Sequence, residues 1–313
     1  MAKKKPYRFI VYLAARAGAA VLALLPRRWA LALARGVGYL GYFLVSSQRT
    51  KILKNLKFAY GEEKSREEIE GIARKVLGNM LQTAFDFLRF TQFARSGKVP
   101  PFVETGEAFS FCKDILQEGK GLIIMTAHMG NWELLAGIFG MQGFTGAVVG
   151  RRIYYEPYNR WIVGLRGSVN VRTIYRDQAV RDIHGQLKQN GIVGLLPDQD
   201  MDNLRGVFVD FFGHPAYTSV APVKLAMSTG APLLPAFLVR LPGDRYKLVI
   251  GKPIRPKSEG NRDEAVRKYT EAWMRCFEEM IRQYPDQWAW MHDRWKTTPQ
   301  KLASQKKEEV RVS

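Results

Sequence analysis

The sequence predicts an α/β domain in which helices flank a mixed, mostly parallel sheet, preceded by an N-terminal helical membrane anchor. Between residues 121 and 250, short apolar runs alternate with amphipathic helical runs. This alternation is typical of parallel strands with helices on both faces. The first 46 residues are apolar and basic, and 313 residues are enough to bury one large core.

The overall charge limits the classes of partner. The chain has 48 Lys and Arg against 29 Asp and Glu, a net charge of +19. This excess attracts polyanions: nucleic acid, anionic lipid headgroups or an acidic carrier protein. Nucleic acid is disfavoured because the basic residues are dispersed and no recognisable binding module is present. The two cysteines, Cys112 and Cys276, lie far apart, which disfavours a disulfide scaffold and a cysteine metal site.

The N-terminus predicts a membrane anchor over residues 1–46. Three lysines precede an apolar run from Phe9 to Leu25 that only Arg16 interrupts, and a second apolar run extends from Trp29 to Val45. One interpretation is a spanning helix from Tyr7 to Leu25, and the other is two amphipathic helices in the membrane interface. The lysines favour a cytoplasmic start. Residues 47–298 then form the main domain, and residues 299–313 a polar tail.

The elements follow in order from local patterns. Ser65 and Glu68 predict a capping box at the start of a helix that continues past residue 80. Strands are expected at 121–127, 145–150, 171–175, 191–196, 233–240 and 246–250, the last two paired with each other. Helices are expected at 132–141, 156–166, 178–189, 219–229 and 262–283.

The segment HMGNWE carries the chemistry. His128 follows the strand at 121–127, and Glu133 lies in the first turn of the next helix. Five residues apart, these side chains converge only if the chain turns between them, and Gly130 permits that turn. Glu133 would then accept the imidazole N–H and leave the other nitrogen of His128 free to take a hydroxyl proton.

Further blocks carry a resemblance. LPDQD at 196–200, FFGHPAYT at 211–218, GAPLLPAF at 230–237 and YPDQWAWMHDRWK at 284–296 follow HMGNWE in order. Together they resemble the lipid A biosynthesis acyltransferases, the late lauroyl and myristoyl transferases, a branch of the His-x4-Asp/Glu acyltransferase group. The likeness covers the chain to Lys296. It implies a glycerolipid acyltransferase-like fold and a catalytic pair of His128 and Glu133.

The resemblance also implies a mechanism. The acceptor hydroxyl attacks an acyl thioester directly, because no serine or cysteine accompanies His128 in the motif. The developing oxyanion would be stabilised either by backbone N–H groups of the Gly130–Asn131 turn or by a nearby arginine. No cofactor is implied.

Substrate-binding residues are expected at two further blocks. VVGRRIYYEPYN at 148–159 resembles the family block with an arginine and a downstream asparagine, here Arg151 or Arg152 and Asn159. Arginine binds phosphate oxygens bidentately. Asp198 and Asp200 follow a strand, where they would orient the histidine, bind the acceptor or cap the following loop.

The remaining histidines and tryptophans are expected to be structural. His184, His214 and His292 are scattered without metal-ligand spacing, so no metal site is predicted. Trp288, Trp290 and Trp295 are expected in the core.

The expected function is transfer of a fatty acyl chain from acyl carrier protein to a hydroxyl of a lipid A precursor, at the cytoplasmic face of the inner membrane. Another glycolipid acceptor, such as a phosphatidylinositol mannoside, and an acyl-CoA donor remain open. The alternative of a different class is a non-catalytic lipid-binding membrane protein.

Overall fold

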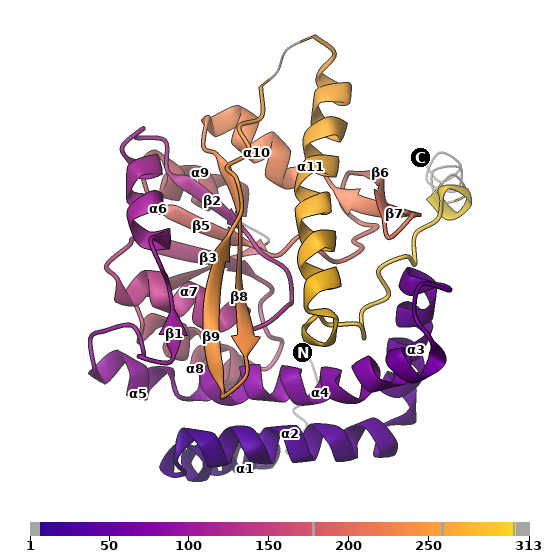
Figure 1. Ribbon diagram of the computed structural model, residues 1–313. Coiled ribbons are helices and arrows are strands. Elements are labelled where there is room, and N and C mark those ends of the chain that lie inside the picture. Colours follow the sequence, from indigo (N-terminus) through magenta and orange to yellow (C-terminus); the bar gives the residue numbers. More distant parts are fainter. Residues whose placement is uncertain (1–6, 177–178, 258–259, 303, 305–313) are drawn as a thin grey trace.

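The fold is built on one central sheet. The structure, a computed structural model, describes residues 7–176, 179–257, 260–302 and 304. Among these residues, seven strands form a sheet in the order β1-β9-β8-β2-β5-β3-β4 (Figure 1). The strands are β1 (Val103–Glu104), β2 (Leu122–Met125), β3 (Gly146–Gly150), β4 (Val171–Tyr175), β5 (Ile192–Leu195), β8 (Leu233–Leu241) and β9 (Arg245–Ile250). Neighbours pair in parallel except β8 and β9.

The sheet separates two apolar cores. Successive side chains of β2 alternate between them, with Ile123 and Met125 in one cluster and Leu122 and Ile124 in the other. The flanking helices are α6 (Ala108–Leu116), α7 (Trp132–Met141), α8 (Glu156–Gly167), α9 (Ala179–Lys188), α10 (Ala221–Thr229) and α11 (Arg262–Gln283). The predicted mixed, mostly parallel sheet flanked by helices is confirmed.

Within the described residues, five helices precede the sheet. They are α1 (Tyr7–Leu24), α2 (Arg27–Leu44), α3 (Ser46–Tyr60), α4 (Arg66–Leu88) and α5 (Phe90–Arg95). α1 and α2 lie side by side beneath α4 (Figure 1). Gly38 of α2 faces Gly78 of α4 so closely that a Cβ at position 38 would lie 2.3 Å from the Gly78 Cα. The predicted capping box of Ser65 and Glu68 opens α4.

The structure confirms that the N-terminal segment contains apolar helices. α1 is long and apolar enough to cross a membrane by length and composition, whereas α2 and α3 form a pair bent by 91°. The predicted boundary at residue 46 falls where α3 begins. The division into 1–46, 47–298 and 299–313 stays a prediction, and residues 305–313 lie outside the described residues.

Several elements differ from the sequence expectation. β6 (Gly206–Phe211) and β7 (His214–Ser219) form a separate antiparallel hairpin, where the sequence analysis expects no strand. β2 ends at Met125, two residues earlier than expected. The chain then leaves the sheet, and Met129 pairs with Trp288 in an isolated antiparallel bridge.

The C-terminal block, residues 284–296, packs against the segment that follows β2. After the short 3-10 helix η2 (Pro285–Gln287), Trp288 and Trp290 are buried, as predicted, while Trp295 is half-buried. The side-chain amide of Asn55 on α3 donates to the carbonyls of Trp290 and His292, both at 2.7 Å. α3 and the segment that follows η2 are therefore in contact.

Candidate active site

His128 is held by both its backbone and its ring. Its backbone N–H donates to Asp198 Oδ2 at 2.9 Å, and its carbonyl accepts from the Ala289 N–H at 3.0 Å. The imidazole Nδ1 lies 2.8 Å from Asp198 Oδ1. The Trp288 indole N–H also donates to Asp198 Oδ2, at 2.9 Å. Asp198 is 1% exposed, so its contacts are with the protein. Of the expected roles of Asp198, these contacts fit the orientation of His128.

The Asp198 contact determines which ring nitrogen is free. Burial alone would raise the pKa of Asp198, but His128 and Trp288 lower it well below its ordinary value. An ionised carboxylate only accepts hydrogen bonds, so Nδ1 of His128 carries the proton and Nε2 has the lone pair. Burial opposes charging of the imidazole, but the charge and hydrogen bond of Asp198 and the charge of Glu133 together raise the pKa of His128.

The turn after His128 needs glycine. Gly130 has φ of +59°, and a Cβ there would lie 2.2 Å from the Leu238 carbonyl oxygen. Its N–H donates to the Gln287 carbonyl at 3.0 Å, and the Asn131 N–H donates to the Leu238 carbonyl at 2.9 Å. The expectation that these two N–H groups stabilise an oxyanion is therefore wrong, because both are already bonded to carbonyls. The expected turn is confirmed.

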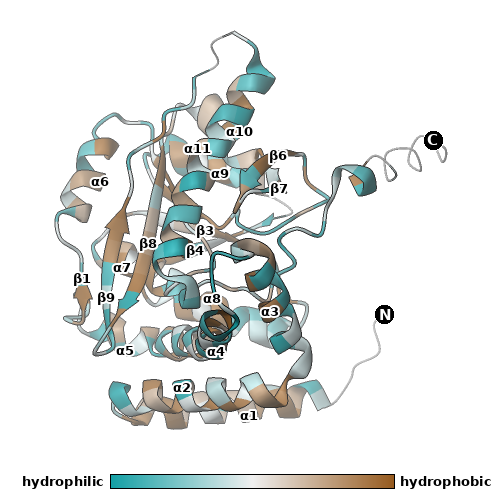
Figure 2. Cartoon of the chain, turned by 45° about the vertical axis from the view of Figure 1, so that its right-hand side comes forward, coloured by the Kyte–Doolittle hydropathy of each residue, from teal (hydrophilic) through white to brown (hydrophobic). Residues whose placement is uncertain are grey.

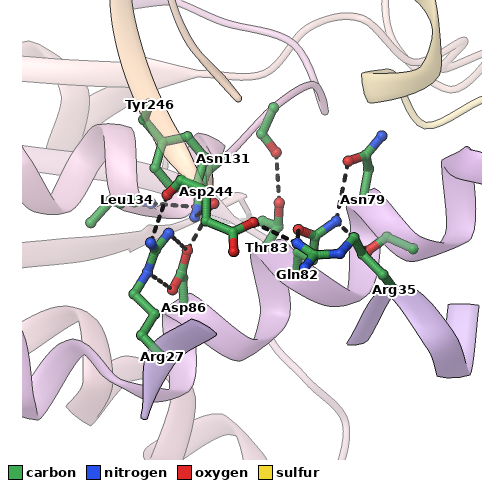
Figure 3. Close-up of polar contacts among 12 residues, drawn as sticks. Arg27, Arg35, Asn79, Gln82, Thr83, Asp86, Asn131, Leu134, Asp244 and Tyr246 are labelled. Atoms are coloured by element: carbon green, nitrogen blue, oxygen red, sulfur yellow. Dashed lines mark hydrogen bonds and ion pairs between the residues drawn. The ribbon is translucent and has the colours of Figure 1, made fainter. Parts of the chain in front are cut away.

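Asn131 caps the helix that follows. Its side-chain oxygen accepts from the Leu134 N–H at 2.9 Å. Its amide donates to the Tyr246 hydroxyl, which donates in turn to Asp86 (Figure 3). Arg27 of α2 binds the same carboxylate with two nitrogens, both at 2.8 Å. A buried polar chain thus connects α2 to the turn beside His128.

Glu133 has a different partner from the one expected. Its carboxylate binds Arg166 of α8 bidentately, with N–O distances of 2.9 and 2.6 Å. The prediction that Glu133 accepts the imidazole N–H is wrong because Asp198 takes that place. Glu133 acts on His128 through its charge, which contributes to the raised pKa.

Three side chains near the imidazole were missed or misjudged. The His292 ring lies 5.3 Å from the His128 ring and contacts Gln199 Nε2 at 3.0 Å. The Trp132 ring lies 5.4 Å from the His128 ring. His292 was expected to be structural or exposed. Gln199 stands between the two aspartates of LPDQD, so its position in that block was the available signal.

Asp200 accepts hydrogen bonds from the C-terminal segment. Its two carboxylate oxygens accept from the backbone N–H and the hydroxyl of Thr297, at 2.8 and 2.7 Å. Asp200 is 7% exposed and Thr297 is 1% exposed. This contact joins Asp200 to the C-terminal segment and differs from the expected cap of the loop that follows residue 200. Substrate binding by Asp200 stays a prediction.

The Arg151–Asn159 segment lies before and within the first turn of α8. Asn159 is buried; its side-chain oxygen accepts from the Ile153 N–H and its amide donates to the Tyr175 hydroxyl at 2.6 Å. Asn159 therefore shapes the loop. Arg152 is exposed, lies over the Tyr175 ring and pairs with Glu156 at 3.6 Å. Arg151 is exposed as well.

A narrow, mostly apolar cavity of about 40 Å³ lies between α7 and the sheet. His128 does not line it, and Trp132 links the cavity to the imidazole. α7 contributes Trp132, Leu135 and Phe139, and the sheet side contributes Ile124, Val148 and Leu196. Trp132 contacts both this cavity and the His128 ring, so the site joins a proton acceptor to a space lined by hydrocarbon.

The chain spans less than two thirds of the length of the first known proteins that it resembles. The lipid A biosynthesis lauroyltransferase of Escherichia coli (strain K12) is 30% identical over 198 residues, 61% of each chain. The phosphatidylinositol mannoside acyltransferase of Mycobacterium tuberculosis (strain ATCC 25618 / H37Rv) is 33% identical over 125 residues, 38% of this chain and 39% of that protein. The lipid A biosynthesis palmitoleoyltransferase of Escherichia coli (strain K12) is 25% identical over 302 residues, 94% of this chain and 87% of that protein.

A family model covers nearly the whole sequence. Residues 2–297 match the model described as bacterial lipid A biosynthesis acyltransferase. That range includes His128, Asp198 and the C-terminal block that holds them. The chain therefore belongs to the bacterial lipid A biosynthesis acyltransferases.

Proposed function

We propose that the protein transfers a fatty acyl group from an acyl thioester, with acyl carrier protein as donor, to a hydroxyl of a lipid A precursor. The observation that carries this proposal is the Asp198–His128 contact of 2.8 Å beside an apolar cavity. The resemblance to a lipid A lauroyltransferase supports the choice of acceptor. Localisation is proposed at the inner membrane, with the catalytic domain on the cytoplasmic side.

The reaction follows from the free nitrogen of His128. Nε2 takes the proton of the acceptor hydroxyl while its oxygen attacks the thioester carbonyl carbon. Asp198 stabilises the resulting imidazolium through Nδ1–H. The tetrahedral intermediate then collapses, the C–S bond breaks, and the departing thiolate receives the proton from Nε2. An ester and a free thiol result, and no acyl-enzyme forms.

Other residues support this step. Glu133 assists His128 by charge while it holds Arg166 in place. An arginine is the remaining alternative for stabilising the oxyanion, because the N–H groups of Gly130 and Asn131 are engaged. Arg151 and Arg152 are exposed and are proposed to bind acceptor phosphates.

The first test is His128→Ala, with His184→Ala on α9 as a control. Purified variants are incubated with a lipid A precursor and with acyl thioesters of acyl carrier protein or coenzyme A. The masses of the products are measured by mass spectrometry. We expect acylation by the parent and by His184→Ala, and none by His128→Ala. Full acylation by His128→Ala would refute the mechanism, whereas absence of acylation by the parent itself would favour a non-catalytic lipid-binding role.

A separate observation favours a second candidate acceptor. The similarity to a mycobacterial phosphatidylinositol mannoside acyltransferase favours a mannosylated lipid as the alternative. Both acceptors are offered to the parent protein in parallel. Acylation of the mannoside alone would retain the chemistry and replace the lipid A assignment.

A further inference from the structure

One side of α1 is an exposed apolar row. Ile10, Ala17 and Leu24 recur every seven residues, so they share one side of the helix. Ile10 is 67% exposed and Leu24 is 85% exposed. No residue of this helix is buried. The helix thus presents a row of hydrocarbon away from the protein.

α2 extends this face. Its small residues, among them Ala34 and Gly38, are buried against α4. Its opposite side exposes Leu33, Leu40 and Leu44, the last at 81%. Figure 2 shows α1 and α2 as one outer layer with hydrophobic residues along both helices. We call the exposed apolar residues of these two helices the α1–α2 face. A contiguous apolar surface of this kind marks a binding site.

The contacts that α1 makes with the rest of the protein disfavour an orientation in which it spans a bilayer. Arg89 donates to the carbonyls of Leu22 and Leu25 at the end of α1, which fixes that end to the α4–α5 junction. Along its length, the Tyr12 ring packs edge-on against Trp161 of α8, and Arg16 lies over the same Trp161 ring. A spanning α1 would carry polar α8 into the hydrocarbon and would bury Arg16 near the bilayer centre, which is costly.

Length and charge favour the interfacial orientation. Eighteen residues of helix extend about 27 Å, slightly less than the roughly 30 Å hydrocarbon core. α1 carries Arg8 and Arg16, and neither α1 nor α2 has an acidic residue. Of the three arginines of α2, Arg27 pairs with Asp86 and Arg35 with Asp244, while Arg28 is exposed. Arginines beside an apolar face fit a surface of anionic lipid headgroups.

The loop of the site lies against the same helix. Arg8 of α1 lies over the Tyr154 ring, and the Tyr158 hydroxyl donates to the Val11 carbonyl at 3.2 Å. Tyr154 is 74% exposed and lies two residues after Arg152. The loop that carries the proposed phosphate-binding arginines is therefore attached to the helix that would touch lipid.

We propose that the protein binds an anionic bilayer through the α1–α2 face with both helices parallel to the surface, and that Tyr154 inserts beside them. Lipid acceptors then approach the Arg151–Asn159 loop from within the membrane plane. The proposal deepens the membrane localisation proposed above and is independent of acyl transfer, because its tests need neither donor nor acceptor.

Depth measurements distinguish a flat helix from an upright one. Ile10→Cys, Ala17→Cys and Leu24→Cys are each labelled with a nitroxide in the full-length chain, reconstituted in phosphatidylglycerol-containing vesicles. The labelled parent gives the background from Cys112 and Cys276. We expect equal, shallow depths at the three positions. An upright helix would separate Ile10 and Leu24 by about 21 Å, with position 17 deepest, and that profile would overturn the proposal.

Vesicle sedimentation tests the surface itself. We expect binding to phosphatidylglycerol vesicles to exceed binding to phosphatidylcholine vesicles at least about tenfold. Leu40→Asp and Tyr154→Asp should each weaken binding severalfold, whereas Val180→Asp, at an equally exposed apolar position on α9, should not. Thermal unfolding of each variant verifies folding. Equal binding of all three folded variants would place the membrane contact elsewhere.

Discussion

At the scale of single residues, His128 depends on groups from distant parts of the chain. Asp198 follows β5, and Trp288 belongs to the C-terminal block, yet both meet at one carboxylate. The carboxylate orients the ring and stabilises its charge. Nε2 is left as the proton acceptor in the proposed mechanism.

Asp198→Asn tests this orienting role. The amide keeps the shape of the side chain but removes the charge that stabilises imidazolium, and it can favour the wrong ring tautomer. We expect kcat for acyl transfer to fall by roughly 10²–10⁴-fold with a small change in KM. An unchanged kcat would show that the 2.8 Å contact does not serve catalysis.

The pH dependence has a definite direction. Because the pKa of His128 is raised above its ordinary value, the acid limb of kcat/KM should lie above pH 6.5. Asp198→Asn should move that limb to lower pH. The contact also stabilises the fold: the contribution of His128 is present below its unfolded pKa and is lost as pH rises through the folded value. Activity and urea-midpoint profiles measure both effects.

The sequence predicted only part of this site. His128 and the Gly130 turn are local features, so a strand–turn–helix pattern revealed them. The partners of His128 and Glu133 could not be read locally, because Asp198 and Arg166 approach only after the sheet and α8 have packed. The occupation of the Gly130 and Asn131 N–H groups likewise depends on Leu238 and the distant Gln287.

At the scale of elements, α2 and α4 approach through two glycines. Gly38→Ala should destabilise the protein by about 1–3 kcal/mol, because its Cβ would meet the backbone of Gly78. Gly36→Ala is the matched control, since nothing lies within 4 Å of its Cβ. We expect that control to be more stable by about 0.5–1 kcal/mol. Urea unfolding measures both; equal effects would mean that the helices do not pack closely.

Element prediction succeeded where one pattern dominated. The bounds of α7, β4 and α11 match the expected ranges 132–141, 171–175 and 262–283, because hydrophobic periodicity there is clear. The hairpin of β6 and β7 was missed because its strands pair only with each other and surround a glycine turn. β1 is two residues long, too short to show any period.

At the scale of the whole molecule, the charge of +19 should govern the encounter with an acidic carrier protein. Raising ionic strength should raise KM for an acyl carrier protein thioester, because salt screens attraction between exposed charges. An uncharged short-chain thioester serves as the control and should show little change. Equal salt dependence for both donors would contradict electrostatic docking of the carrier.

The hydrogen bonds of Asn55 to the Trp290 and His292 carbonyls tie α3 to the segment that carries Trp288. Because Trp288 and Asp198 fix the imidazole in the proposed mechanism, local unfolding of either segment would remove the support of the proposed base while the central sheet stayed folded.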